Sequence, residues 1–373
     1  MPKLSSMQGV LSHPKGLSHG QDAGARNLLL ECAQARPGER LLIAYEHETH
    51  RYFDPKVRES ISASARTLGL RVEMVDVGFD PAPSGLKPDL LQRLPEVDIV
   101  LFLARLGDQL RFSDLPRGAR FVVCFAIDQL LLGSAFGTAS YTGFCEVKSA
   151  VDACMLASKE IVITCPLGTR IVGHLPPDAT DVKDTTSMRF PMSIFSPVPA
   201  DHFSGRAVLN GFLTGTGARY YDDYTVEFDA PLAAILESGR LAGFEGAPGD
   251  VARADQQYDR VAGLFGLDRN AVHSWHAGIH PGCGFPWAMR GAYEKWGGAA
   301  FGNPRILHFH TCGATPPGEI SWNLIDPTIR VDGTAIWEGG RLHLERIPGG
   351  GDILARFADL AALFRTPDRR IGL

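Results

Sequence analysis

The sequence predicts a protein of the α/β class in two parts, a parallel-sheet α/β domain over residues 1–180 and a β-rich α+β domain over residues 181–373. Between residues 20 and 165, apolar segments alternate with segments of helical pattern, which is typical of a parallel sheet covered on both faces. After residue 168 the segments shorten and Gly, Pro and Asp become frequent, which is typical of strands and hairpins. A chain of 373 residues also exceeds the size at which one core usually keeps growing.

The elements of the first part follow one another in a regular order. A helix is expected over residues 22–34 (DAGARNLLLECAQ), followed by a strand over 40–46 (RLLIAYE). Further helices are expected over 56–69, 88–94 and 145–160, and further strands over 70–77, 97–104, 119–127 and 160–167. In the second part we expect a helix over 251–264 and a final hairpin over 329–347 with turns at Asp332-Gly333 and Gly339-Gly340.

The composition describes an ordinary globular protein, with 45% apolar and 21% charged residues. A net charge of −5, without a run of five like charges, gives no electrostatic footprint for nucleic acid or an anionic membrane. The longest apolar stretches are too short to span a bilayer, and the first residues lack the apolar segment of a signal peptide. We therefore expect a cytoplasmic protein that binds a small molecule. Seven cysteines without paired spacing are expected to be free thiols.

Histidines are concentrated near the C-terminal end. The segments HSWHAGIHPG and LHFHTCG carry five of the twelve histidines in the chain: His273, His276, His280, His308 and His310. If LHFH is a strand, His308 and His310 point to one face, because side chains alternate along a strand. A glycine-containing turn could bring His276 and His280 against that face, which predicts a three- or four-histidine site for Zn²⁺ or Fe²⁺. The sequence contains neither a G-x-G-x-x-G segment nor a Walker A segment.

A metal-free pocket is the alternative interpretation of the same histidines. In that case His276 and His308 act as general acid and base, and Ser321 and Asn323 supply hydrogen bonds to the substrate.

Five other residues are candidates for contact with a substrate. Arg105 and Arg111 follow a predicted strand, where a guanidinium could hold a carboxylate through two hydrogen bonds, although surface ion pairs are the alternative. Tyr141 is a candidate catalytic residue and Glu146 a candidate substrate contact at the start of a helix, whose dipole would stabilise the Glu146 carboxylate. Trp322 is a candidate for the wall of an aromatic pocket, with core packing as the alternative.

Five segments of the chain, taken in order, resemble those of a known superfamily. They are GTRIVGHL (168–175), FPMSIFSPVP (190–199), HAGIHPGC (276–283), RILHFHTCG (305–313) and EISWNLIDPTIRVDGT (319–334). Together with the α/β first part, they are similar to the thermophilic metallo-aminopeptidase (aminopeptidase T) superfamily, which also contains the iron-dependent 2,5-dihydroxypyridine dioxygenases. The resemblance covers roughly half of the chain.

The residues at the family's metal site differ from the family pattern. The peptidases hold two metals with glutamates, histidines and an aspartate, and the dioxygenases hold one iron with two histidines and a carboxylate. The resemblance places His276 at the first iron ligand of the dioxygenases and His308 at a peptidase ligand. Residues 193–194 (Ser-Ile) replace a metal-binding glutamate, and Ser321 and Asn323 replace the closing His-x-Asp pair. A hydroxyl and an amide are weaker ligands than the groups they replace, so any metal must be held by a rebuilt set.

The resemblance implies an enzyme, with His276 and the missing glutamate favouring the dioxygenase side. The implied function is metal-assisted, Fe(II)-type ring cleavage of a small aromatic or cyclic substrate, with Fe(II) or Zn as the cofactor. Two alternatives stay open. One is a hydrolase, either divergent and aminopeptidase-like or a metal-free amide or ring hydrolase that uses histidine acid–base catalysis, and the other is a non-catalytic binding protein on the same fold. The resemblance also implies a homo-oligomer.

Overall fold

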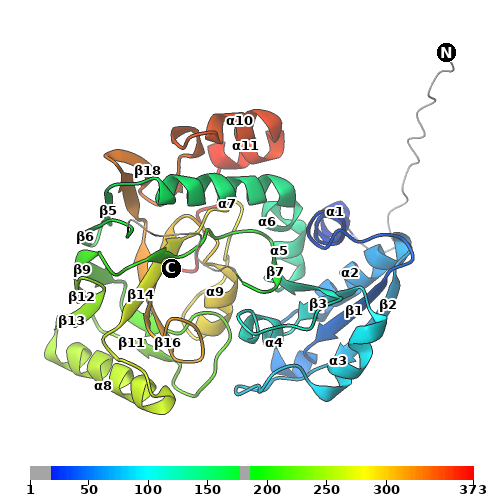
Figure 1. Ribbon diagram of the computed structural model, residues 1–373, viewed down its shortest axis with the longest axis horizontal. Coiled ribbons are helices and arrows are strands. Elements are labelled where there is room, and N and C mark those ends of the chain that lie inside the picture. Colours follow the sequence, from blue (N-terminus) through cyan, green and yellow to red (C-terminus); the bar gives the residue numbers. More distant parts are fainter. Residues whose placement is uncertain (1–17, 177–184) are drawn as a thin grey trace.

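A five-stranded parallel sheet forms the centre of the N-terminal lobe (Figure 1). The structure, a computed structural model, describes residues 18–176 and 185–373. The strands lie in the order β2 (Arg71–Asp76), β1 (Arg40–Tyr45), β3 (Ile99–Leu103), β4 (Arg120–Cys124) and β7 (Met188–Phe190). Every neighbouring pair in this sheet is parallel. Strand β7 comes from a segment far along the chain from β4, so the N-terminal sheet is completed by a later part of the sequence.

Helices cover both faces of this sheet, which explains its near-continuous apolar strands. Alternation along β1 places Leu41 and Ile43 on one face, against residues of α1 and α2, and places Leu42 and Ala44 on the other, against α3 and α4. The helices of this lobe are α1 (His19–Arg26), α2 (Pro55–Thr67), α3 (Pro88–Arg93), α4 (Arg105–Gln109), α5 (Gln129–Gly133) and α6 (Ala135–Thr138). A π-helical turn (Asn27–Cys32) continues α1.

An antiparallel sheet of six strands carries the histidine-rich segments. Its order is β11 (Thr225–Glu227), β10 (Phe212–Thr214), β16 (Glu319–Ile325), β15 (Ile306–Cys312), β14 (Val272–Ala277) and β8 (Val198–Pro199). All residues of β15 and β16 are buried. Because β15 lies between β14 and β16, side chains from three adjacent strands meet on each face of the sheet.

A second antiparallel sheet shares one hydrophobic core with the first. Its order is β13 (Arg240–Glu245), β12 (Leu232–Glu237), β9 (Ser204–Leu209), β6 (Arg170–Gly173), β5 (Ile161–Thr164), β17 (Thr328–Val331), β18 (Thr334–Glu338) and β19 (Arg341–Leu342). The shared core contains Trp275 and Phe309 of the six-stranded sheet with Ile163 and Leu209 of the eight-stranded one. The C-terminal lobe is thus a pair of sheets packed on each other.

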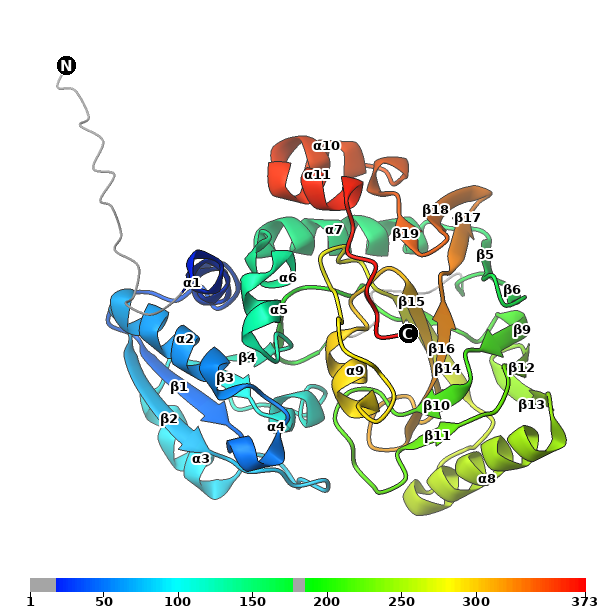
Figure 2. The same cartoon turned by 180° about the vertical axis from the view of Figure 1, so that it is seen from behind.

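Five helices of the described chain pack against the C-terminal lobe. Helix α7 (Tyr141–Leu156) crosses the top of this lobe, with α10 (Gly350–Arg356) and α11 (Ala358–Arg365) above it (Figures 1 and 2). Helix α8 (Pro248–Phe265) has Pro248 in its first turn and ends at Gly266, whose φ of 65° suits a left-handed cap. Helix α9 (Tyr293–Ala299) joins the lobes, because Trp296 packs into the core cluster of the N-terminal lobe.

The structure confirms the predicted fold class, an α/β lobe with a parallel sheet followed by antiparallel β structure. The predicted hairpin turns are also present, with positive φ at Asp332, Gly333, Gly339 and Gly340. One expected strand is misplaced: residues 160–167 contain β5, which pairs antiparallel with β6 and β17 in the C-terminal lobe. The domain boundary at residue 180 stays a prediction, and β5 and β7 each lie on the other side of it from their own sheet.

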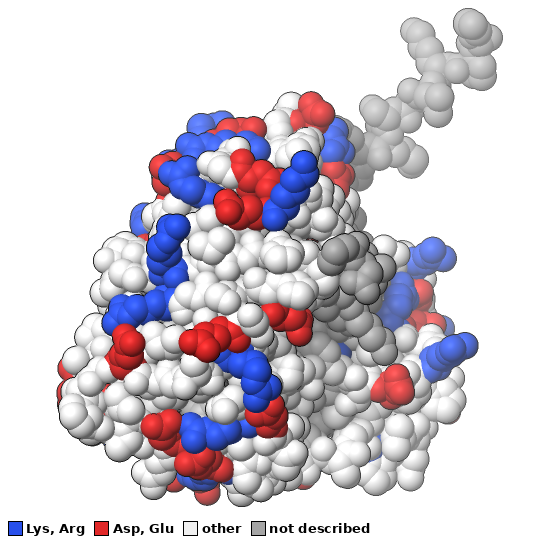
Figure 3. Space-filling view, turned by 60° about the vertical axis from the view of Figure 1, so that its left-hand side comes forward, with Lys and Arg blue, Asp and Glu red and all other residues white. Residues whose placement is uncertain are grey.

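The surface mixes charges of both signs. Figure 3 shows basic and acidic side chains interspersed on one face of the C-terminal lobe, in keeping with 37 basic and 42 acidic residues in the sequence. Within residues 18–176 and 185–373, no helix has both the length and the apolar character needed to cross a membrane.

Candidate metal centre

Three histidines from two neighbouring strands meet on one face of the six-stranded sheet. His276 of β14 lies directly opposite His308 of β15, and His310 follows two residues along β15. The alternation of β15 therefore puts His308 and His310 on the same face, as the sequence predicted. All three residues are buried, with exposed fractions of 4%, 1% and 6%.

The ring nitrogens of these histidines converge on one another. Nε2 of His276 lies 2.7 Å from Nε2 of His308 and 3.1 Å from Nε2 of His310. One ligand atom from each ring falls within 4.8 Å of the other two. We refer to His276, His308 and His310 as the histidine cluster.

Neighbouring groups determine which nitrogen of each ring carries the proton. Nδ1 of His276 lies 2.9 Å from the carbonyl oxygen of Phe195, which can only accept, so Nδ1 donates and Nε2 of the neutral ring carries a lone pair. Nδ1 of His310 lies 2.6 Å from Oε1 of Glu319, a buried carboxylate that also accepts from the Thr216 hydroxyl. This carboxylate–histidine pair leaves the Nε2 atom of a neutral His310 as a ligand, as in many metal sites.

The electrostatics favour the neutral form of the His276 and His308 rings. Burial, followed by the charge of His310, lowers the pKa of His276 well below its ordinary value. Burial and the two neighbouring histidines do the same for the pKa of His308. Burial alone would raise the pKa of Glu319, but His310 and Arg111 outweigh it, so the pKa of this carboxyl is lowered and it is ionised at neutral pH. Neutral imidazoles beside an ionised carboxylate are the form that binds a cation.

The arrangement fits a divalent ion. Lone pairs on nitrogens about 3 Å apart repel unless a proton or a cation lies between them, and one proton cannot serve three rings. A tetrahedral ion with Zn–N bonds of 2.0–2.1 Å holds its ligand nitrogens roughly 3.3 Å apart, close to the separations of 2.7 and 3.1 Å. Nδ1 of His308 has no hydrogen-bond partner among the described residues, so the ring can turn or shift at small cost. Three neutral imidazoles are also a donor set of catalytic zinc sites.

A cavity of about 260 Å³ opens beside the histidine cluster, between the two lobes. The N-terminal lobe contributes the segment after α4 and strand β7, and the C-terminal lobe contributes the histidines and the end of α9. Aromatic rings form much of the wall: Phe112, Phe125, Phe136, Phe195 and Phe301. The Phe301 ring lies 4.2 Å from the ring of His308, centroid to centroid. The volume and the walls suit a small, flat molecule.

Basic side chains outnumber acidic ones in the cavity wall. Among the described residues, Arg111, Lys148 and Arg189 line the cavity with a single acid, Asp108. Nη1 of Arg111 lies 3.0 Å from Oδ1 of Asp108, and the Arg189 guanidinium lies 4.2 Å from the centre of the Phe125 ring. The charges of Arg111 and Arg189 help to lower the pKa values of His276 and His308, after burial and the neighbouring histidines. The cluster therefore lies in a positive field.

His280, which the sequence offered as a fourth ligand, is not part of the cluster. Its ring stacks on Phe144 at 3.7 Å and meets Phe136 edge-on at 5.0 Å. Nδ1 of His280 accepts a hydrogen bond from the backbone N–H of Gly282, and burial lowers the pKa of the ring to about 3. The turn after β14 carries this ring to the other side of the strand, into aromatic packing.

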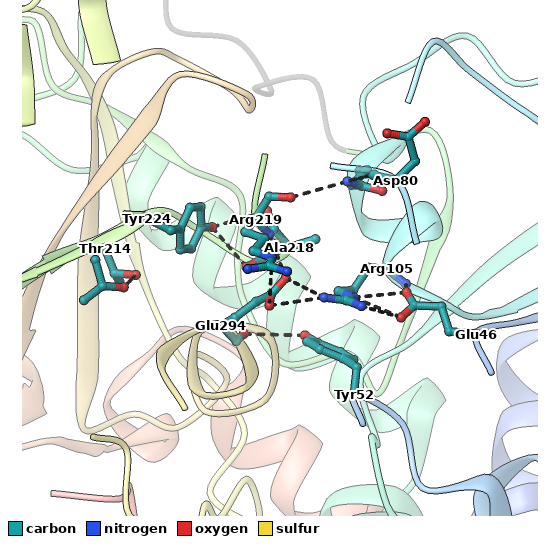
Figure 4. A network of polar contacts seen from close by, with 12 residues as sticks. Glu46, Tyr52, Asp80, Arg105, Thr214, Ala218, Arg219, Tyr224 and Glu294 are labelled. Atoms are coloured by element: carbon teal, nitrogen blue, oxygen red, sulfur yellow. Dashed lines mark hydrogen bonds and ion pairs between the residues drawn. The ribbon is translucent and has the colours of Figure 1, made fainter. Parts of the chain in front are cut away.

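Arg105, proposed as a substrate contact, belongs to a different buried cluster (Figure 4). Its guanidinium lies 2.7 Å from the carboxylate of Glu46 at the end of β1 and 3.1 Å from that of Glu294 on α9. It also lies over the Phe79 ring at 3.4 Å. Because Arg105 does not line the cavity, its role is to link the lobes. We refer to Arg105, Glu46 and Glu294 as the arginine cluster.

Two further candidates lie away from the cavity. Trp322 is fully buried on β16, with its side chain opposite to that of its neighbours Ser321 and Asn323, and its Nε1 donates to the Tyr258 hydroxyl at 2.6 Å. Glu146 forms an ion pair with Arg356 at the surface. Trp322 is a core residue, and Glu146 is a surface residue that does not meet a ligand in this cavity.

The remaining candidates either line the cavity or lie next to the histidine cluster. Arg111 and Tyr141 line the cavity, and burial raises the pKa of the Tyr141 hydroxyl, so that it stays protonated. Ser321 and Asn323 pair with His310 and His308 across the β15–β16 ladder. They are fully buried, hydrogen-bond to each other at 3.2 Å, and do not line the cavity. Their side chains lie beside those of His310 and His308, on the same face of the sheet.

Three neighbours of the cluster were not recognised from the sequence: Glu319, Thr216 and the Phe195 carbonyl. A signal for Glu319 existed, because residues 319, 321 and 323 alternate along one strand and share a face. The other two contacts come from loops distant in the sequence. Without the pairing of strands, nothing in the residues themselves indicated them.

The fold and the cluster define this chain as an α/β protein with a candidate metal centre between a parallel-sheet lobe and an antiparallel lobe. No family model and no curated protein matches its sequence. Among solved structures it is similar to 2,5-dihydroxypyridine dioxygenase from Pseudomonas putida KT2440, with a TM-score of 0.57, 15% identity and coverage of 88% of this chain and 98% of that one. It is also similar to AmpT from Thermus thermophilus, with a TM-score of 0.50, 12% identity and coverage of 87% and 98%. At these identities the likeness establishes a shared fold, and it confirms the structural resemblance predicted from the sequence.

Proposed function

We propose that this protein is a metal-dependent enzyme that cleaves the ring of a small aromatic substrate with O₂. The observation that carries the proposal is the convergence of three buried imidazole nitrogens at the wall of an aromatic cavity. His276, His308 and His310 would hold the ion. Fe(II), when bound, would supply the one-electron chemistry that O₂ needs to react with an aromatic ring.

The residues around the ion have separate roles. The Phe195 carbonyl and Glu319 hold His276 and His310 in the tautomers that present Nε2 to the ion. The phenylalanine walls keep water from the ring of the substrate and position it. Tyr141 lies at the same wall, where its protonated side chain would contact the substrate.

The charge of the cavity argues against an aminopeptidase. A peptide substrate brings a positively charged amino terminus, whereas this wall carries three basic side chains and one acidic one. Like charges in such a site repel, and Asp108 is the one acid among the described residues that line the cavity. The shared fold with AmpT therefore does not extend, in this proposal, to a shared substrate.

A second function is favoured by the donor set itself. Three histidines without a carboxylate among them match a catalytic zinc site, in which the ion lowers the pKa of a bound water to about 7. The second candidate is therefore a zinc-dependent hydrolase for a small cyclic or aromatic amide or ester.

Reconstitution with each metal distinguishes the two. The protein is loaded anaerobically with Fe(II) or with Zn(II) and mixed with a panel of single-ring phenols and hydroxypyridines, while O₂ uptake and ring absorbance are recorded. The proposal expects O₂ uptake with Fe(II) only, lost in His308→Ala and kept in His273→Gln, a control on the same strand as His276. Hydrolysis of ring amides or esters by the zinc form, without O₂ uptake by the iron form, would favour the second candidate.

A further inference from the structure

We infer that the substrate of this cavity is an aromatic anion, whose carboxylate pairs with Arg111 while a second oxygen on the ring faces the histidine cluster. The inference rests on the proposed function and names its substrate class. It is carried by the position of Arg111, the charge balance of the cavity and the shape of its walls.

Arg111 is a buried cation with donors to spare. Its side chain is among the cavity-lining residues, and the residue is only 5% exposed. Nη1 contacts Asp108, through the backbone oxygen at 2.8 Å and through Oδ1 at 3.0 Å. Among the described residues, Nε and Nη2 of Arg111 have no hydrogen-bond partner at all. A carboxylate is the group that takes two parallel hydrogen bonds from a guanidinium edge.

Asp108 is already committed elsewhere, so it cannot satisfy the rest of Arg111. Its Oδ2 accepts from the backbone N–H of Ala218 at 2.8 Å, and its Oδ1 faces Nη1 of Arg111. The carboxylate thus orients the guanidinium and leaves its other edge for a ligand. An arginine held in this way keeps one guanidinium edge free to bind an anion.

The histidine side of the cavity also calls for negative charge. As metal ligands, His276, His308 and His310 would be neutral imidazoles, so a divalent ion there would keep its full charge, and the Glu319 carboxylate contacts His310 rather than the ion site. Arg189 adds a further cation to the wall. An ionised or hydroxyl oxygen on the ring would balance this end, as the carboxylate balances Arg111.

Aromatic rings lie beside both groups. The Phe301 ring lies against the His308 ring, and the guanidinium carbon of Arg111 lies 4.9 Å from the centre of the Phe112 ring. In this inference a planar ring lies between the two phenylalanines, with one polar substituent toward Arg111 and another toward the histidine cluster. A neutral hydrocarbon would leave the free edge of Arg111 and the ion without an anionic partner, and a cationic ligand would be repelled.

The test compares acids with amides of the same shape. Zinc-loaded full-length protein is titrated calorimetrically at pH 7 with benzoate, 2-hydroxybenzoate and pyridine-2-carboxylate, and with the three corresponding carboxamides. At least one acid is expected to bind ten times or more tightly than its amide. In Arg111→Gln the ratio should fall to within threefold of unity, and in Arg111→Lys, which keeps the charge but not the fork, it should lie between. Arg290→Gln, 81% exposed at the surface, is the control and should leave the ratio unchanged.

The outcomes separate this inference from the proposed function. If zinc is bound but no acid binds more tightly than its amide, the inference is overturned and the metal site stands. An unchanged ratio in Arg111→Gln overturns it as well. If the protein binds no metal, the proposed function fails first. If Arg111→Gln does not fold, the ratio of acid to amide affinity in the wild type and in Arg111→Lys still tests the inference, because neither measurement needs that variant.

Discussion

Two buried polar clusters join the elements of this protein, and they are built on opposite principles. In the arginine cluster the guanidinium of Arg105 is satisfied on all sides, by Glu46 through Nε and Nη2 and by Glu294 through Nη1. In the histidine cluster the ring nitrogens point at one another, and Nδ1 of His308 has no partner within the described part of the chain. A buried polar group that serves the fold alone is normally paired. The histidine cluster, with its facing ring nitrogens and the unpaired Nδ1 of His308, is therefore the one that indicates function.

Arg105 was a candidate substrate contact in the sequence, and its burial alone does not distinguish it from a residue of the histidine cluster. Arg105 and His310 are almost equally buried, with exposed fractions of 5% and 6%. The guanidinium of Arg105 is surrounded by carboxylates, whereas Nε2 of His310 faces another ring nitrogen, and these partners are distant in sequence.

The largest expected effect is a loss of stability when the arginine cluster is broken. Arg105→Met leaves the carboxylate of Glu46, a residue 4% exposed, buried without its cation. We expect a loss of about 3–5 kcal/mol in the free energy of unfolding, the usual cost of removing one partner of a buried ion pair. Urea denaturation measures it. Arg240→Met, which removes an exposed pair with Asp268, is the control and should cost less than about 1 kcal/mol. Equal losses in the two variants would mean that the arginine cluster is not a structural link.

The next largest effect is expected at Glu319, which orients His310 in the histidine cluster. Glu319→Gln keeps an acceptor for Nδ1 of His310 but removes the charge. Metal affinity, measured by competition with a chromogenic chelator, should fall by 10- to 100-fold, about 1.4–2.7 kcal/mol. Glu146→Gln, at a surface pair outside the cavity, should leave the affinity unchanged. An unaltered affinity in Glu319→Gln would show that His310 is not a ligand or is held by other means.

Nε2 of His280 has no hydrogen-bond partner among the described residues. This residue therefore tests whether an unpaired nitrogen is by itself enough to make a functional site. Burial lowers its pKa to about 3, whereas the unfolded chain binds the proton near pH 6.5. The unfolded state therefore gains protons first as the pH falls, and the wild type loses stability between pH 6.5 and 3. Between pH 7 and pH 5, it should lose about 2 kcal/mol more than His280→Phe. Chemical denaturation at the two pH values checks this.

The metal content of His280→Phe should equal that of the wild type. A loss of metal in this variant would place His280 among the ligands after all, and an equal pH dependence in both proteins would contradict the lowered pKa.

The smallest effect is expected at Ser321 and Asn323, the neighbours of the histidine cluster on β16. Ser321→Ala removes a hydrogen bond to Asn323 and should cost about 1 kcal/mol of stability. Metal affinity should change by less than threefold, because neither side chain belongs to the converging set. A much larger loss of metal would show that Ser321 of β16 also contributes to the metal site.

Much of this architecture could be predicted from residue patterns. The two-faced apolar strands of the N-terminal lobe follow from local periodicity, and so does the shared face of His308 and His310. Strand β5 was misplaced because a short apolar run after a helix has the same pattern in a parallel sheet as at the centre of an antiparallel one.

The parts that could not be predicted depend on pairing between distant segments. His276 reaches the cluster because β14 pairs in register with β15, whereas the sequence indicated only a turn. Glu294 reaches Arg105 across the lobes. Neither contact follows from periodicity or composition, because both arise from the packing of elements far apart in the chain.

The central claim is that the histidine cluster is completed by a metal ion. The direct measurement is the number of metal ions per chain, by elemental analysis after loading with Fe(II) or Zn(II) and exhaustive dialysis. We predict one ion per chain in the wild type and in His273→Gln, and less than a tenth of an ion in the His308→Ala/His310→Ala double variant, since the one remaining donor, His276, would not be enough to hold it. A metal-free wild type, or a double variant that keeps its ion, would contradict the account.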